Sequence, residues 1–117
     1  MTMLVAVADA ERLHAALTYA AAGAAAGGAM RIHLHEGAVG LLRPPLAATA
    51  DRARTNAGLP TLEQIFEEAL ALGVTVTVCQ SGLALAGLKL GEIDPRVEAQ
   101  GPVGMLSALG DDRLVIF

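Results

Sequence analysis

The hydrophobic pattern of the chain alternates between short apolar runs and longer segments of helical period. Met3–Ala8, Val74–Val78 and Arg113–Phe117 have the length and aliphatic content of strands, and an unbroken run such as Met3–Ala8 is typical of a strand covered on both faces. In Met30–His35 apolar and polar positions alternate, which indicates a strand with one less buried face or a place near the edge of a sheet. Arg96–Ala99 predicts a further short strand. The pattern therefore predicts five strands.

Four segments between these strands predict helices, because capping residues mark their ends. Asp9 is suited to cap a helix from about Ala10 to Gly27. Thr61, with Gln64 three residues later, is close to a capping box for an amphipathic helix that ends at Leu72. Two shorter helices are expected from about Ser81 to Leu88 and from Gly101–Pro102 to about Leu109.

Strands and helices thus alternate along the whole chain. This order predicts an α/β fold of three layers (α/β/α), in which a five-stranded parallel sheet has helices on its faces, joined by right-handed crossovers. At 117 residues we expect one domain, residues 1–117. The order of the strands across the sheet does not follow from the pattern.

The segment Glu36–Pro60 is the least regular part. Gly37–Leu42 can form a helical turn that Pro44-Pro45 must end, and one more turn of helix is expected within a long loop. A loop of this length in a compact domain is usually functional or disordered. We consider two roles for it: a cover over a site at the strand ends, or a contact between subunits. It carries three basic residues, Arg43, Arg52 and Arg54.

Composition excludes several classes of function. The formal charge of −4 offers no basic stripe for phosphates, which argues against nucleic acid as a partner. The Ala- and Gly-rich span Ala15–Met30 is too weakly apolar to predict a membrane segment, and Asp9 and Glu11 do not suit a signal peptide. A single cysteine excludes an internal disulfide and a multi-cysteine zinc site, and a reducing cytoplasm is the expected location.

Two other patterns fall short of a motif. Gly82–Lys89 approaches a phosphate-binding loop, but the Lys is one position late and no Ser or Thr follows, so no nucleotide cofactor is predicted. His33 and His35 lie on one face of a strand, and Glu36 follows them. A zinc site would need a further ligand, so we predict no metal. His35 and Glu36 nevertheless stand at the carboxyl end of a strand, where sites of parallel sheets form, and we take them as candidate ligand-binding residues.

Cys79 is the candidate catalytic residue. It follows the strand Val74–Val78 and precedes Gln80, Ser81 and Gly82, which provide turn and helix-start chemistry and are candidates to surround the sulfur with N–H groups. Such donors favour the thiolate, the reactive form of cysteine. The alternative is that Cys79 is a small buried hydrophobic residue without chemistry.

The chain resembles the DsrE/DsrF-like sulfur-relay proteins, which include the TusD-type carriers. The resemblance covers essentially the whole chain and rests on Leu59–Glu63 at a helix start, on Leu72–Ser81 around Cys79, and on Gly101–Met105 before the last strand. It implies that Cys79 carries sulfur as a persulfide and that the protein is a homo-oligomer, a trimer or hexamer, with sulfur donor and acceptor proteins as partners. Unlike the more cysteine-rich relatives, this chain has no second Cys for an internal relay.

Two functions are therefore compared. The first is a small sulfur carrier, or sulfurtransferase-like protein, that uses Cys79 as a persulfide-forming thiol. The alternative is a non-catalytic oligomeric binding module that holds a small ligand at the strand carboxyl ends. A peroxide-reducing thiol is less favoured because no resolving cysteine is present.

Overall fold

Five strands form one parallel sheet in the computed structural model, which describes all 117 residues. In chain order they are β1 (Thr2–Val5), β2 (Arg31–Leu34), β3 (Thr75–Val78), β4 (Glu98–Ala99) and β5 (Leu114–Ile116). Across the sheet the order is β4-β3-β2-β1-β5, with every neighbouring pair parallel. The predicted α/β fold is confirmed, although β4 is only two residues long.

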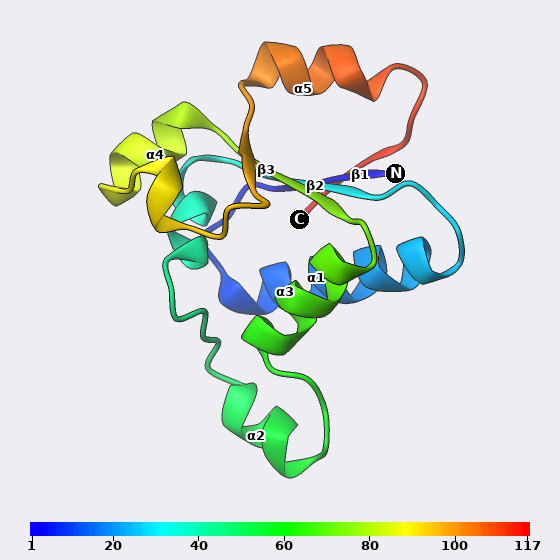
Figure 1. The fold of residues 1–117 in the computed structure, drawn as a ribbon, viewed down its shortest axis with the longest axis vertical. Coiled ribbons are helices and arrows are strands. Elements are labelled where there is room, and N and C mark those ends of the chain that lie inside the picture. Colours follow the sequence, from blue (N-terminus) through cyan, green and yellow to red (C-terminus); the bar gives the residue numbers. More distant parts are fainter.

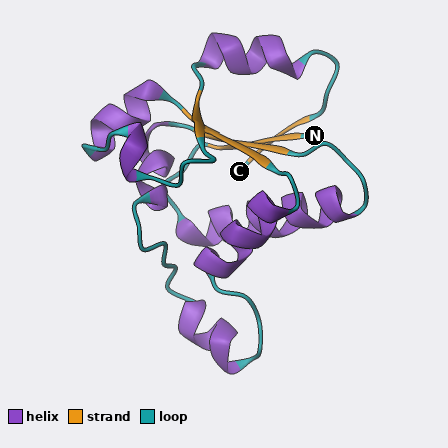
Figure 2. Ribbon diagram, in the orientation of Figure 1, coloured by secondary structure: helices purple, strands orange, loops and turns teal.

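Helices cover the two faces of the sheet unequally (Figure 1). α1 (Ala10–Ala25) and α3 (Leu62–Ala71) pack side by side beneath one face, whereas α5 (Pro102–Leu109) lies alone above the other. Figure 2 shows the strands edge-on between these layers. The two helices beneath the sheet thus give one face a thicker cover than the single helix gives the other. No helix of the chain combines the length and the apolar character that crossing a membrane requires.

The remaining helical segments lie beyond the strand ends or away from the sheet. α4 (Gln80–Ala86) and the 3₁₀ helix η1 (Glu36–Leu42) pack on each other at the carboxyl ends of the strands. α2 (Asp51–Asn56) extends away from the sheet, and η2 (Leu90–Glu92) is a single turn.

The predicted caps form. The Asp9 carboxylate accepts hydrogen bonds from the N–H groups of Glu11 and Arg12 at the start of α1. Thr61 and Gln64 complete the capping box of α3. Because the orphan N–H groups of both helices are satisfied this way, their starting points are fixed by local sequence.

The two faces of the sheet differ in chemistry. Toward α1 and α3 the strands present aliphatic side chains such as Ile32, Leu34 and Val76, which are almost fully buried. The alternate positions face α5 and include His33 and Thr77, which are buried polar residues. The expectation that Met30–His35 lies near an edge is wrong: β2 is the central strand, and its polar positions point to the α5 side.

The long segment after β2 is tied to the start of α1. Arg54 forms ion pairs with Glu11 and with Asp51, and the Glu11 carboxylate also accepts a hydrogen bond from the N–H of Ala50. These contacts hold the pKa of the Glu11 carboxyl below its usual value, the bond from Ala50 having the largest effect. The part of the segment around α2 is therefore anchored to the start of α1.

Candidate functional site

Cys79 stands where β3 becomes α4. Its N–H donates to the carbonyl of Leu34 at 3.3 Å, so pairing with β2 continues through this residue. Its extended backbone (φ −82°, ψ 151°) makes it the N-cap of α4, and its sulfur accepts the hydrogen bond that a Ser or Asp oxygen would accept at that position. The end of β3 and the beginning of α4 together place the sulfur next to the first turn of the helix.

Three donors surround the Cys79 sulfur. The N–H of Glu36 lies 3.0 Å from Sγ, the N–H of Gly82 3.3 Å and the hydroxyl of Ser81 3.4 Å. Burial raises the pKa of the thiol and is the largest single influence, but the hydrogen bonds from Ser81, Glu36 and Gly82 together outweigh it. The pKa of Cys79 is therefore lowered, and the site favours a thiolate.

Glu36 reaches the sulfur through its backbone, which adopts a conformation unusual for its residue type. Its φ of +43° lies in the left-handed region, which costs a non-glycine residue about 1–3 kcal/mol. This turn directs the chain from β2 into η1 and points the Glu36 N–H at Cys79. The carboxylate turns elsewhere and pairs with Nε2 of His35 at 3.1 Å.

Gly82 lets η1 approach closely enough for that hydrogen bond. A Cβ atom at position 82 would lie 2.2 Å from Cγ2 of Val39 and 2.7 Å from the carbonyl oxygen of Glu36, distances that no real side chain tolerates. With glycine there, Val39 packs directly on the first turn of α4. As a result Cys79 is only 1% exposed, with η1 as its cover.

The candidate site residues separate into two groups. Ser81, Gly82 and the backbone of Glu36 gather on the sulfur. Gln80 is exposed and makes no hydrogen bond to it. If the pairing of β2 with β3 is extended by one residue, His35 lies opposite Cys79. Its side chain nevertheless lines a cavity on the α5 face of the sheet and makes no hydrogen bond to the sulfur.

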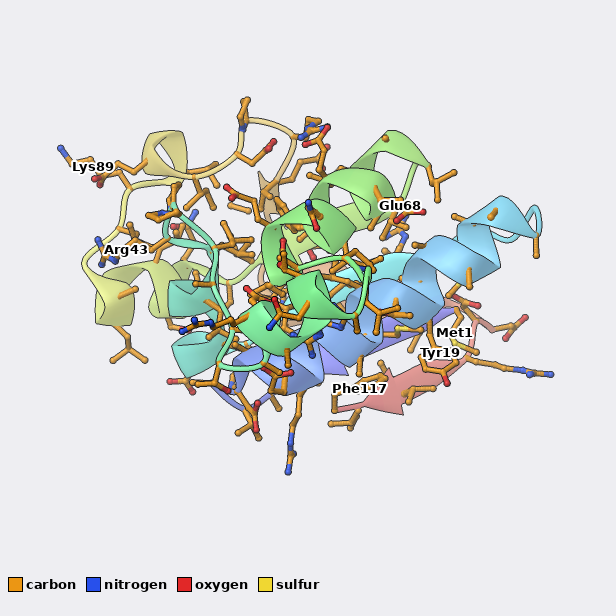
Figure 3. The ribbon with its side chains drawn as sticks, turned by 90° about the horizontal axis from the view of Figure 1, so that it is seen from below. Met1, Tyr19, Arg43, Glu68, Lys89 and Phe117 are labelled. Atoms are coloured by element: carbon orange, nitrogen blue, oxygen red, sulfur yellow. The ribbon has the colours of Figure 1, made fainter.

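The arginines of the 36–60 segment are engaged away from the sulfur. Arg43 donates to the carbonyl of Ala86 at the end of α4, and Figure 3 shows it beside that helix. Arg54 is held by its two carboxylates, and Arg52 is exposed. The cover over the thiol is therefore η1, without a guanidinium beside Sγ.

The chain was compared with known proteins. No protein-family model matches it, and no curated protein does. Similar solved structures include MTH1491 from Methanobacterium thermoautotrophicum, with a TM-score of 0.68 and 14% identity over 99% of this chain and 96% of that chain. They also include BT1422 from Bacteroides thetaiotaomicron, with a TM-score of 0.67 and 14% identity over 99% of this chain and 94% of that chain. Both are described as proteins of unknown function. At this identity the similarity shows the fold alone.

The hydrogen bonds at Sγ predict that Cys79 titrates below the roughly 8.5 of a free cysteine. Ser81→Ala should raise the pKa, because the thiolate loses a donor. Ultraviolet absorbance of the thiolate against pH measures both, with Cys79→Ser as the blank. Because the pKa of Cys79 is lower in the folded than in the unfolded protein, the hydrogen-bonded thiolate stabilises the fold. This contribution is fully present above the pKa of the unfolded state and is lost as the pH falls through the pKa of the folded state. A wild-type midpoint at or above the free value would refute the prediction.

The close approach at Gly82 predicts that Gly82→Ala destabilises the protein by about 1–3 kcal/mol, because η1 must shift to admit the methyl group. The same shift should speed modification of the Cys79 thiol. Gly91→Ala is the matched control, since its Cβ would meet nothing within 4 Å. Denaturant unfolding and thiol-labelling rates test both effects. Equal results for the two variants would show that η1 does not depend on Gly82.

Proposed function

We propose that this protein is a sulfur carrier in which Cys79 holds sulfane sulfur as a persulfide. The observation that supports this function best is the set of three hydrogen bonds donated to Sγ by Glu36, Ser81 and Gly82. A buried cysteine that served only packing would need no such donors. A thiolate, in contrast, is stabilised by them and is the nucleophile that sulfur transfer requires.

The proposed reaction is an exchange without net oxidation. The Cys79 thiolate attacks the outer sulfur of a donor persulfide, a new Sγ–S bond forms, and the donor's S–S bond breaks with its electron pair leaving on the donor thiolate. The outer sulfur keeps its proton, so Cys79 becomes Cys–S–SH. An acceptor thiolate then attacks that outer sulfur and returns Cys79 to the thiolate.

Access to the sulfur requires movement of its cover. Cys79 is 1% exposed and lies beneath η1, whereas Ser81, one of its donors, is exposed at the surface. Displacing Glu36 and Val39 would uncover the sulfur from the side of η1. In this proposal η1 takes the covering role that the sequence suggested for the whole 36–60 segment.

Membership of the DsrE/DsrF-like family is part of the same proposal. It is supported by the place of Cys79 at the end of β3 and by the capped helix that begins after Leu59-Pro60. The free thiol fits a reducing cytoplasm. With no second Cys in the chain, the acceptor thiol must come from another molecule.

Sulfur loading tests the function directly. Wild-type protein incubated with a low-molecular-weight persulfide and weighed intact should gain one sulfur atom, and Cys79→Ser should gain none. Ser81→Ala should load more slowly at neutral pH, because less of its thiol is ionised. Leu85→Ala, an exposed change on α4, is the control for an unrelated substitution. Loading that survives in Cys79→Ser, or a wild-type thiol that reacts only after denaturation, would exclude this carrier role.

We also propose that the protein is a homo-oligomer, and the support in the structure is the apolar side chains that it leaves exposed. Of the four leucines in the 36–60 segment, for which the sequence left a subunit contact open, Leu41, Leu42 and Leu46 pack in or against the core. Exposed apolar side chains gather instead on α5 and on the edge strand β5, where Val103 is 80% exposed and Ile116 64%. An apolar surface that includes an open strand edge favours association.

This surface predicts an oligomer in light scattering at micromolar concentration, and the resemblance to the sulfur-relay proteins implies that it is a trimer or hexamer. Val103→Glu should lower the measured mass, because a charge would be buried in the interface. Tyr19→Glu, at a site on α1 that is 68% exposed, is the control. A wild-type mass near the monomer's 11.9 kDa would contradict the proposal.

A further inference from the structure

A cavity of about 260 Å³ lies between the sheet and α5. Its walls are mainly apolar, and two imidazoles from β2 and the residue after it, His33 and His35, reach it. The principal apolar lining comes from Leu4, Met105, Leu106 and Leu114. It therefore joins a large apolar area to a few polar atoms, which is the usual make-up of a small-molecule site.

His33 is the polar group built into this cavity. The residue is 2% exposed, and its Nδ1 is 2.8 Å from the Thr77 hydroxyl on β3. Its Nε2 makes no hydrogen bond within the protein, yet no buried side-chain nitrogen or oxygen of the protein lacks a partner. Nε2 is therefore not enclosed by protein atoms and opens on the cavity that His33 lines.

The Thr77 bond decides which ring nitrogen carries the proton. If Nδ1 donated to the hydroxyl oxygen, the hydroxyl hydrogen would have no acceptor, because Thr77 makes no other side-chain hydrogen bond. With the hydroxyl donating to Nδ1, the hydroxyl and Nδ1 are both satisfied, and the imidazole carries its proton on Nε2, which has no partner within the protein. Burial, and then the nearby His35, lower the pKa of His33 below its ordinary value, which favours the neutral ring at neutral pH. The Nε2–H group of His33 is therefore a hydrogen-bond donor that faces the cavity.

We propose that this cavity binds a small, mainly apolar, uncharged molecule whose carbonyl oxygen accepts a hydrogen bond from Nε2–H of His33. An apolar wall disfavours a charged group, which would lose its hydration without a paired ion. The volume is below the roughly 300–1,000 Å³ of sites for drug-sized ligands, so the occupant is smaller, of the size of a cyclic ketone.

This site is separate from the sulfur chemistry. His33 lies within β2, on the face of the sheet, whereas Cys79 lies beyond the end of β3. The two places adjoin at the end of β2, where His35 lines the cavity, the Glu36 N–H contacts the sulfur and His35 lies opposite Cys79. Ligand binding therefore does not need the thiol, and Cys79→Ser should retain it.

Cyclohexanone is the probe, with cyclohexane and cyclohexanecarboxylate as analogues that lack the acceptor or carry a charge. Nuclear magnetic resonance of the ¹⁵N-labelled full chain follows the imidazole nitrogens and backbone amides during titration. Cyclohexanone should shift the His33 Nε2–H signal and the amides of Met105 and Leu106, and the shifts should saturate. Cyclohexane should bind about three- to tenfold more weakly, the value of one neutral hydrogen bond. The carboxylate should bind more weakly than the ketone.

Single substitutions test whether His33 is the hydrogen-bond donor to the ketone. His33→Phe keeps an aromatic ring but removes the Nε2–H donor, and it should weaken ketone binding about three- to tenfold. His14→Phe, which removes an imidazole bonded to the carbonyl of Pro60, should leave binding unchanged. Met105→Phe should reduce binding by filling the cavity, which tests the site even if His33→Phe does not fold. No saturable shift, equal binding of ketone and hydrocarbon, or tightest binding of the carboxylate would each overturn the proposal.

Discussion

The contact between η1 and the first turn of α4 is the constraint on which the sulfur site depends. Gly82 has no Cβ, so Val39 and the Glu36 carbonyl can lie where a side chain would otherwise be. That approach brings the Glu36 N–H to 3.0 Å from Sγ of Cys79 and at the same time buries the sulfur. Burial raises the thiol pKa and the hydrogen bonds lower it, so one contact both shields and activates the same atom.

The unequal cover of the sheet explains the second site. Beneath the sheet two helices with many small residues pack on aliphatic side chains and leave a continuous core. Above it α5 is alone, and the strand positions that face it include the polar pair His33 and Thr77. The hydrogen bond between these two side chains reduces the cost of burying them. The space between them and α5 is not filled by protein side chains and remains a cavity. A polar donor inside an apolar hollow is the result.

The sequence was sufficient for the fold class and for part of the site. Alternating strand and helix signals, with caps at Asp9 and Thr61, depend on local chemistry that a single sequence carries. Ser81 and Gly82 were expected around the sulfur because they follow it directly in the chain. The backbone contribution of Glu36 could not be foreseen, since a left-handed φ at a non-glycine residue has no local signature. Alternation around His33 suggested a less buried face or an edge position, because its hydrogen-bond partner, Thr77, lies on another strand and is not visible in the local pattern.

The closed arrangement also constrains how Cys79 would carry sulfur. A persulfide adds a second sulfur beyond Sγ, at a place now bounded by the Glu36 N–H and the turn at Gly82. Loading must therefore move η1, which gives up the packing of Val39 on α4. It would also free Glu36 from its left-handed conformation, which offsets part of that loss by about 1–3 kcal/mol. The strained residue thus lowers the cost of opening at the point where the proposed chemistry requires it.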